Sequence, residues 1–89
     1  MARDFNLIWA RIKRHEGEIF AQIRGGRFCY AVEGNAIVPD RTNVVISRKQ
    51  LEEASKLLPL GNTVPVQHLR GPSYIYAVLM DPRIRQLDW

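Results

Sequence analysis

The chain has 89 residues, of which 46% are hydrophobic and 25% are charged, proportions typical of a folded globular domain rather than a disordered chain. At this length we expect one hydrophobic core, in a single α+β domain spanning residues 1–89. Thirteen Lys and Arg residues outnumber nine Asp and Glu residues and give a net charge of +4. That balance suits nucleic acid or an acidic partner without identifying either.

Composition also excludes several classes of site. Cys29 is the only cysteine, so no internal disulfide can form, and the two histidines lack the spacing of a zinc site. No glycine pattern of a nucleotide cofactor is present, and we predict no metal, cofactor or catalytic residue. The longest apolar run, residues 74–80, is far shorter than the roughly 20 residues that span a bilayer. With no apolar leader, we expect a cytoplasmic protein without membrane contact.

The first predicted element is a helix over residues 5–15. Asp4 is a suitable N-cap, and Gly17 suits the position just beyond the C-terminal end. Apolar residues recur at the three- and four-residue spacing that places them on one helix face: Phe5, Ile8, Trp9 and Ile12.

The next element is a β-hairpin with strands over residues 18–24 and 27–33. Gly25-Gly26 between them readily adopts the positive φ angles of a two-residue turn. Folding the chain at that turn opposes three apolar pairs on one face: Ile23 with Phe28, Ala21 with Tyr30, and Ile19 with Val32. The same register opposes like charges on the other face: Arg24 with Arg27 at the tip, and Glu18 with Glu33 at the base.

A second turn at Gly34-Asn35 is predicted to return the chain as a third strand, residues 36–38. A loop follows, and residues 44–46 form either a short strand or the approach to the next helix. That helix has Ser47 as N-cap and Gln50 in a capping box. Its predicted buried stripe consists of Leu51, Ala54 and Leu58. Pro59 is expected to end the helix near Leu58.

The C-terminal third begins with residues 63–70, whose central proline allows an edge strand or extended segment at most. Gly71-Pro72-Ser73 marks a helix start, with the serine as cap, and the helix continues through residues 74–80. An Asp-Pro pair ends or kinks it, and we expect the tail, residues 83–89, to be only partly ordered. The predicted order is helix, antiparallel two- or three-stranded hairpin or meander, helix, and short C-terminal helix.

Two clusters of basic residues are candidate nucleic-acid contacts. Arg24 and Arg27 at the hairpin tip would hold phosphates entering beside the flexible glycines. Arg48 and Lys49 occupy the first turn of the middle helix, where free backbone N–H groups attract anions, and Arg41 precedes them in the loop. The alternative for each residue is an ordinary solvated charge, and for Lys49 a pair with a glutamate one turn on.

Two further features have alternative interpretations. Arg70 and Ser73 near the start of the last helix form either a third anion site or an ordinary capped start. The residues 74–80 are apolar all the way round, which indicates either a core helix or one that covers a partner. A homodimer or protein partner would contact Tyr74, Tyr76 and Met80.

The sequence therefore favours a small non-enzymatic nucleic-acid-binding or accessory domain that uses the basic hairpin tip and the basic helix N-terminus. The first alternative is a homodimerising or other protein-interaction module that uses the apolar helix. The second is a small toxin-type nuclease with His15 or His68 and a glutamate as acid and base. A separate interpretation brings His15, Glu18 and Glu33 together at the hairpin base as a metal or acid–base site, with a structural or solvated histidine as the alternative.

By element order, the first five elements are similar to the double-stranded-RNA-binding domain. That domain uses its first strand–strand loop and the basic start of its second helix on phosphates and grooves. The matching positions here are residues 24–27 and 48–49. The characteristic loop and lysine-rich helix start of that family are absent, so the resemblance is one of element order alone.

Overall fold

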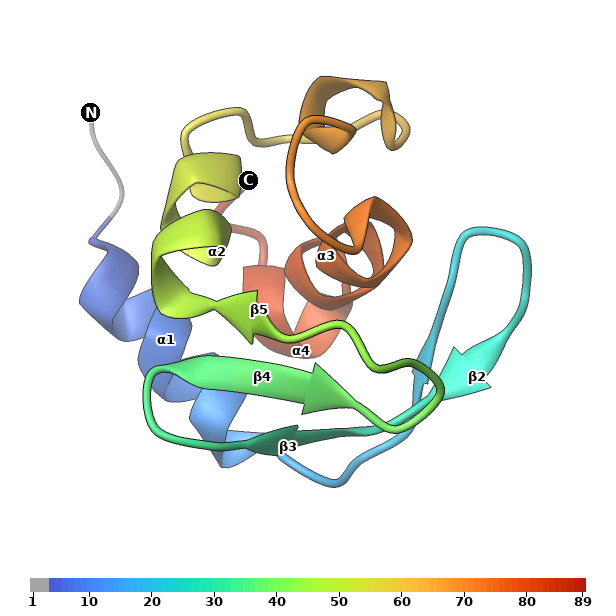
Figure 1. Cartoon of the computed structure of the whole chain (residues 1–89). Helices are drawn as coiled ribbons and strands as arrows, with labels where there is room; N and C mark the ends of the chain where they lie inside the picture. The colour runs from blue at the N-terminus through green and yellow to red at the C-terminus, as the bar shows by residue number, and fades with distance from the viewer. Residues whose placement is uncertain (1–3) are drawn as a thin grey trace.

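The computed structural model describes residues 4–89 and confirms the α+β class (Figure 1). A first helix, α1 (Phe5–Arg14), precedes five short strands, and the remaining helices follow in the second half of the described chain. The strands are β1 (Phe20–Ala21), β2 (Arg27–Phe28), β3 (Tyr30–Val32), β4 (Ala36–Pro39) and β5 (Ile46–Ser47). The later helices are α2 (Arg48–Ser55), a 3-10 turn (Val64–Val66), α3 (Pro72–Leu79) and α4 (Pro82–Arg85).

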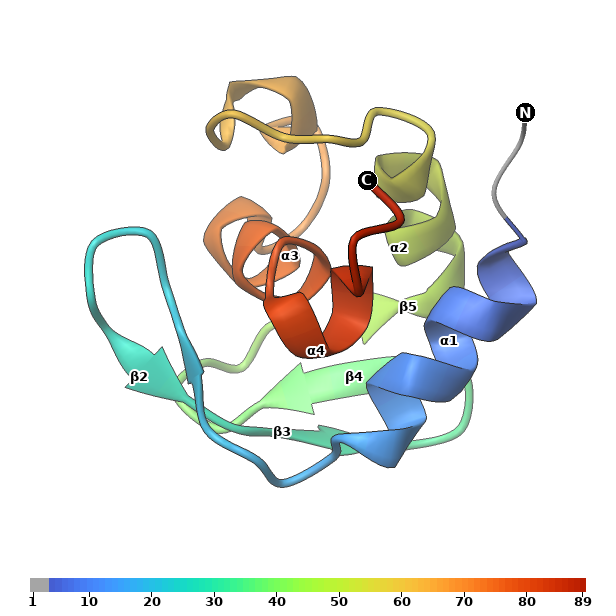
Figure 2. The same cartoon turned by 180° about the vertical axis from the view of Figure 1, so that it is seen from behind.

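The strands form two small antiparallel sheets, β1 with β2 and β3-β4-β5 in that order. The helices α2, α3 and α4 lie together above the three-stranded sheet (Figure 1). From behind, α4 lies between α1 and α3 (Figure 2), and it contacts both of them. Within residues 4–89, no helix combines the length and apolar character that crossing a membrane requires.

The helix α1 forms where its periodicity predicts. The Asp4 carboxylate accepts the N–H of Asn6 at 2.9 Å, and the basic residues of the last turn complement the helix dipole. The Tyr30 hydroxyl from β3 donates to the Ile12 carbonyl at 2.6 Å, which joins the end of α1 to the sheet. All four residues of the predicted apolar face are buried: Phe5, Ile8, Trp9 and Ile12.

The β1–β2 hairpin forms, but its predicted register is wrong. The observed cross-strand pairs are Phe20 with Phe28 and Ala21 with Arg27. This register differs from the predicted one by a shift of three residues, an odd number, so the inward and outward faces of the first strand are exchanged. Ile19 and Ile23, predicted to face the core, are instead 65% and 49% exposed.

The observed register buries Phe20, which the predicted register would have left facing solvent. Its ring centroid lies 6.1 Å from that of Phe28 and 5.2 Å from that of Tyr30, and all three side chains are almost completely buried. Complete burial of a phenylalanine contributes about 1.5 to 3 kcal/mol. The aromatic cluster therefore sets the register, and the glycine pair accommodates it.

Residues 22–26 consequently form a five-residue loop in place of the predicted two-residue turn. Gly25 does adopt a positive φ, of 90°. The N–H of Gly25 donates to the Gln22 carbonyl at 2.8 Å, and the N–H of Gln22 donates to the Gly26 carbonyl at 2.7 Å. Arg24 lies within this loop and is not the cross-strand partner of Arg27.

The predicted strand 27–33 is divided at Cys29 between the two sheets. Its second half, β3, pairs with β4 through the predicted turn at Gly34-Asn35. Glu33 therefore lies at this second turn and does not oppose Glu18, which corrects the predicted pair at the hairpin base. The short strand β5 joins β4 as the third strand of the sheet.

The helix α2 begins as its capping signal predicts, since the Ser47 hydroxyl accepts the N–H of Gln50 at 3.2 Å. The Gln50 side chain does not complete the predicted capping box, because its carbonyl oxygen accepts the N–H of Arg70 at 3.1 Å. This bond joins α2 to the segment before α3. The helix ends at Ser55, and the predicted stripe is buried: Leu51, Ala54 and Leu58.

The helix α3 has Gly71 as its N-cap, with a positive φ of 60°. Ser73 was predicted to cap the helix and does not, because it is already the second residue of the helix. Its hydroxyl accepts a hydrogen bond from Gln22 Nε2 at 3.0 Å. The tail after α4 packs on the helices, since the Trp89 indole donates to the Leu79 carbonyl at 2.8 Å.

Candidate functional site

Arg24 lies in the loop of the β1–β2 hairpin and Arg27 begins β2, and Arg41 reaches the hairpin from the β4–β5 connection; we call these three residues the hairpin corner. The Arg41 guanidinium donates from Nη1 to the backbone carbonyl of Arg27 at 3.1 Å. The sequence placed Arg41 beside the start of α2. The topology carries it elsewhere, because Pro39 at the end of β4 pairs with Tyr30, two residues after β2.

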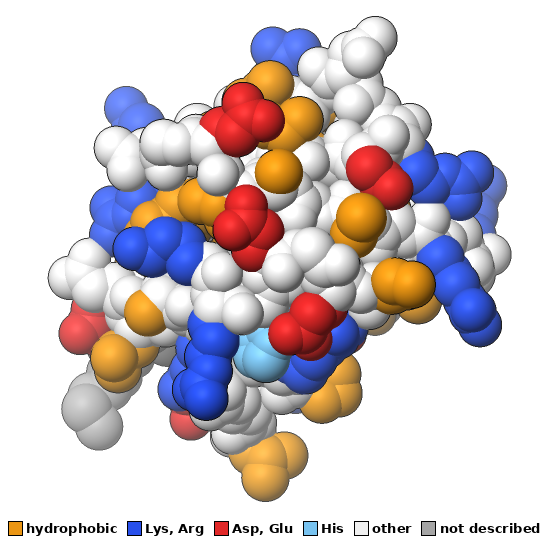
Figure 3. Space-filling model, turned by 90° about the horizontal axis from the view of Figure 1, so that it is seen from below, with side chains coloured by type: hydrophobic (Ala, Val, Ile, Leu, Met, Phe, Trp, Pro, Cys, Tyr) orange, Lys and Arg blue, Asp and Glu red, His pale blue; other side chains and the backbone are white. Residues whose placement is uncertain are grey.

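The three arginines of the hairpin corner are exposed, and none forms an ion pair with a carboxylate in the described part of the chain. Seen from below, Lys and Arg side chains project at the right-hand edge, the side on which the hairpin lies in Figure 1 (Figure 3). Asp40, the acidic residue next to Arg41, accepts hydrogen bonds from the backbone N–H and thiol of Cys29 at 3.1 and 3.5 Å. Asp40 is therefore directed toward Cys29, and none of the three guanidinium groups is paired with a carboxylate among the described residues.

A cavity of about 330 Å³ lies between the hairpin loop and the start of α3. The Gln22–Ser73 hydrogen bond joins its two walls. Arg24 from the first predicted cluster and Ser73 from the third thus border the same cavity. The complete lining is Gln22, Ile23 and Arg24 on one side, and Thr63, Pro72 and Ser73 on the other.

Arg48 and Lys49 lie at the other end of the three-stranded sheet from the hairpin corner, where α2 begins (Figure 1). The Arg48 guanidinium donates to the Asn6 side chain at 2.6 Å and stacks 5.2 Å from the Phe5 ring centroid, so it belongs to the contact between α1 and α2. Its backbone N–H donates to the Asn35 carbonyl at 2.7 Å. The fold therefore does not unite this predicted cluster with the first.

Lys49 itself remains exposed at the start of α2. Its predicted pairing with Glu53 is not formed, because Lys56 approaches that carboxylate at 3.3 Å. Both side chains of the observed pair are at least half exposed, and such pairs contribute little to stability. Lys49 is therefore an exposed basic side chain at the start of α2, whereas Arg41, which the sequence grouped with it, contacts the hairpin.

The helix α3 is largely part of the core, with four fully or nearly fully buried residues at its centre and end: Ile75, Ala77, Val78 and Leu79. Tyr74 packs edge-on against Phe28, with ring centroids 4.8 Å apart. Tyr76 and Met80 are half-buried against the same core. Packing within one chain accounts for the apolar pattern of this helix, so no further observation favours the predicted homodimer surface.

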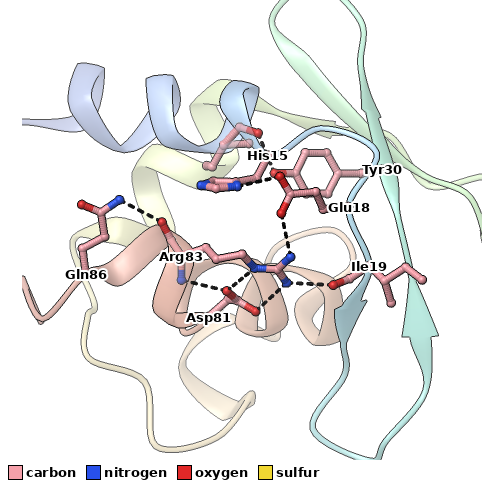
Figure 4. A network of polar contacts seen from close by, with 8 residues as sticks. His15, Glu18, Ile19, Tyr30, Asp81, Arg83 and Gln86 are labelled. Atoms are coloured by element: carbon pink, nitrogen blue, oxygen red, sulfur yellow. Dashed lines mark hydrogen bonds and ion pairs between the residues drawn. The ribbon is translucent and has the colours of Figure 1, made fainter.

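The most connected polar cluster joins the end of α1, the chain entering β1, and α4 (Figure 4). We call His15, Glu18, Asp81 and Arg83 the arginine clasp. Arg83 Nε donates to Asp81 and Nη1 to Glu18, each at 2.9 Å, and Nη2 donates to the Ile19 carbonyl at 2.7 Å. The other oxygen of Glu18 lies 2.9 Å from His15 Nδ1. The Arg83 guanidinium also lies 4.0 Å from the centroid of the Phe20 ring beneath it.

The arginine clasp shifts the pKa values of its own groups. Hydrogen bonds from His15 and then Arg83 lower the pKa of Glu18 below its ordinary value. Burial acts to raise the pKa of Asp81, but hydrogen bonds from the side chain and backbone of Arg83 outweigh it and lower that pKa. The hydrogen bond to Asp81 raises the pKa of Arg83. Both carboxylates therefore stay ionised, as in a structural ion-pair network.

The predicted convergence of His15, Glu18 and Glu33 is not found, since the register places Glu33 at the β3–β4 turn. Within residues 4–89, no three His, Cys, Asp or Glu side chains are grouped to hold a metal ion. The hydrogen bond to Asp40 raises the pKa of the Cys29 thiol, whereas a nucleophilic cysteine requires a lowered one.

The sequence did not indicate that Gln22, Ile23 and Thr63 line a cavity. It also did not indicate that Arg83 is held by hydrogen bonds to Asp81, Glu18 and the Ile19 carbonyl. The predicted register puts Ile19, Ala21 and Ile23 on the inner face, so Gln22 falls on the outer face with Phe20, and only the size of Phe20 could have indicated the true register. Arg83 was assigned to a partly ordered tail, and its contact with Glu18 spans 65 residues.

Comparison with protein-family models, curated proteins and solved structures finds no match for this chain. The interpretation of the hairpin corner therefore rests on its own geometry and charge.

Proposed function

We propose that this chain is a small nucleic-acid-binding domain that contacts the sugar–phosphate backbone through the hairpin corner. The single observation that carries this proposal is the position of Arg41, which comes from the β4–β5 connection yet donates to the carbonyl of Arg27. Two loops thus contribute three exposed arginines to one corner. Guanidinium groups present forked N–H donors that suit phosphate oxygens.

Two arginines elsewhere in the chain contrast with those of the hairpin corner. Arg11 and Arg83, on the α1 and α4 side, form ion pairs with Asp88 at 2.7 Å and with Asp81 and Glu18 at 2.9 Å. Grouping like charges at the hairpin corner without such partners opposes folding. A bound polyanion would supply the missing partner charges, and release of its counterions would drive binding.

We assign the main contact to the hairpin corner alone. Arg48 is engaged with Asn6 and Phe5, and Lys49 lies at the far end of the sheet. Phosphate contacts of this type position a protein on nucleic acid without selecting a sequence. We therefore expect binding that depends strongly on salt and weakly on base order.

A salt titration tests this proposal on labelled single-stranded and duplex oligonucleotides. The double variant Arg24→Gln/Arg27→Gln removes two phosphate contacts. We expect its plot of log affinity against log salt to be less steep than that of the wild type, by about 1.4 on single strands or about 1.8 on duplex. The matched control is Lys13→Gln/Arg14→Gln, which removes the same charge from the exposed end of α1. Equal slopes in the two variants, or no binding at low salt, would contradict the proposal.

A further inference from the structure

We infer that the cavity beside Arg24 receives one unpaired nucleotide, with its base between the hairpin loop and α3 and its phosphate on the arginine. The domain would then bind single strands or strand ends in preference to continuous duplex. This inference rests on the proposed function and specifies which form of nucleic acid the hairpin corner recognises.

The size and apolar walls of the cavity suit a single base. Its volume of about 330 Å³ is at the lower end of the roughly 300–1,000 Å³ of small-molecule sites. Ile23 from the hairpin loop and Pro72 from the first turn of α3 both line it. The Ile23 side chain is 49% exposed, so it offers apolar surface on which the flat face of a base can pack.

The polar groups of the cavity suit the edge of a base. The Ser73 oxygen accepts the Gln22 amide N–H at 3.0 Å, which leaves the hydroxyl proton of Ser73 as a donor. The Thr63 side chain does not cap the 3-10 turn that follows it, and its hydroxyl can both donate and accept. Mixed donors and acceptors beside apolar walls match a nucleobase better than they match a simple anion.

The position of Arg24 connects this cavity to the backbone contact. Arg24 lines the cavity and is one of the three arginines of the hairpin corner, so a strand whose phosphates follow the arginines passes the cavity mouth. A base in continuous duplex is stacked and paired and must leave the stack to enter a protein pocket. A base in a single strand or at a frayed end enters without that cost.

The test compares four probes by fluorescence anisotropy: a short single-stranded oligonucleotide, the blunt duplex of the same sequence, the same strand with abasic sites throughout, and a free nucleoside monophosphate as competitor. We expect the single strand to bind about tenfold more tightly than the abasic strand, the effect of burying one base against the apolar walls of the cavity. We also expect it to bind more tightly than the duplex. The monophosphate should compete only at much higher concentration.

Two variants locate the effect in the cavity. Thr63→Leu fills the cavity without removing charge and should lower single-strand affinity by about tenfold with an unchanged salt slope. The exposed Gln67→Leu, an apolar change in the same segment, should leave affinity unchanged. If Thr63→Leu fails to fold by circular dichroism, Ile23→Ser removes an apolar wall from an exposed loop position and should weaken single-strand binding in the same direction.

The outcomes separate this inference from the proposed function. Equal affinities for the single strand, the duplex and the abasic strand, with the arginine-dependent salt slope retained, would overturn the cavity inference and leave the proposed function intact. Loss of affinity equal in Thr63→Leu and Gln67→Leu would also overturn it. A monophosphate that competes as well as the strand would identify the ligand as a free nucleotide and overturn it. No binding of any probe at low salt would overturn both proposals.

Discussion

The hairpin corner and the arginine clasp use the same side chain in opposite surroundings. In the clasp, Arg83 contacts two carboxylates, a backbone carbonyl and the face of Phe20. In the hairpin corner, Arg24, Arg27 and Arg41 are exposed and have no carboxylate partner among the described residues. Composition counts all four arginines alike, whereas their partners separate a charge that holds the fold from charges available to a ligand.

The two regions also both depend on Phe20. Its ring supports the guanidinium of Arg83 on one side of the hairpin, and its pairing with Phe28 sets the register that creates the five-residue loop. One buried aromatic residue therefore positions both groups. If the comparison is correct, substitutions in the clasp should affect stability and substitutions in the corner should affect binding.

The largest expected difference is in stability. Arg83→Ala should lower the free energy of unfolding by about 2 kcal/mol, since charged hydrogen bonds contribute about 1.5 to 3 kcal/mol and Asp81 is left partly buried without its partner. Arg24→Ala should change it by no more than about 0.5 kcal/mol. Urea denaturation of both variants measures the difference. Equal losses would remove the distinction between the two regions.

The pH dependence of stability should be smaller in size and specific to the clasp. Glu18 and Asp81 have pKa values below the unfolded values of 4.5 and 3.8. Their contribution is therefore fully present above those unfolded values and is lost as the pH falls through the lower pKa values of the folded state. The wild-type melting temperature should fall more steeply than that of Arg83→Ala on acidification below about pH 5. Parallel profiles would show that the ion pairs contribute nothing.

The backbone conformation of Gly25, in the loop of the hairpin corner, should also contribute to stability. Gly25 has a φ of +90° and open space where the Cβ of a larger residue would lie, whereas Gly61 has the same open space without a positive φ. Gly25→Ala should therefore cost about 1 kcal/mol through backbone strain alone. Gly61→Ala should be neutral or slightly stabilising. Thermal unfolding of the two variants tests this, and equal melting temperatures would mean that the loop relaxes without cost.

The elements that the sequence predicted correctly depend on neighbouring residues. Asp4 with the apolar face of α1, and Ser47 at the start of α2, are signals contained within one or two turns. The turn at Gly34-Asn35 is equally local. Capping, periodicity and turn chemistry act over a few residues, so each could be evaluated without knowledge of the rest of the chain.

The features that the sequence could not supply depend on distant contacts. The hairpin register was decided by the burial of Phe20 rather than by its glycines. Arg41 joined the hairpin through strand pairing, and Ser73 reached Gln22 across 51 residues of sequence. Arg24, Arg27 and Arg41 were all named from the sequence as phosphate contacts, and this stays a prediction. The position of Arg41 beside Arg27 and the cavity between the hairpin loop and α3 required the fold.

The smallest expected effect bears most directly on the comparison. In Arg24→Gln/Arg27→Gln, loss of two exposed charges should change the free energy of unfolding by no more than about 0.5 kcal/mol, with any change stabilising at low salt because like-charge repulsion is removed. Added salt should reduce the difference from wild type, and urea denaturation at two salt concentrations measures it. A loss above about 1 kcal/mol would mean that these arginines support the fold as Arg83 does. Unchanged stability together with lost oligonucleotide binding would leave ligand contact as the role of the unpaired charge.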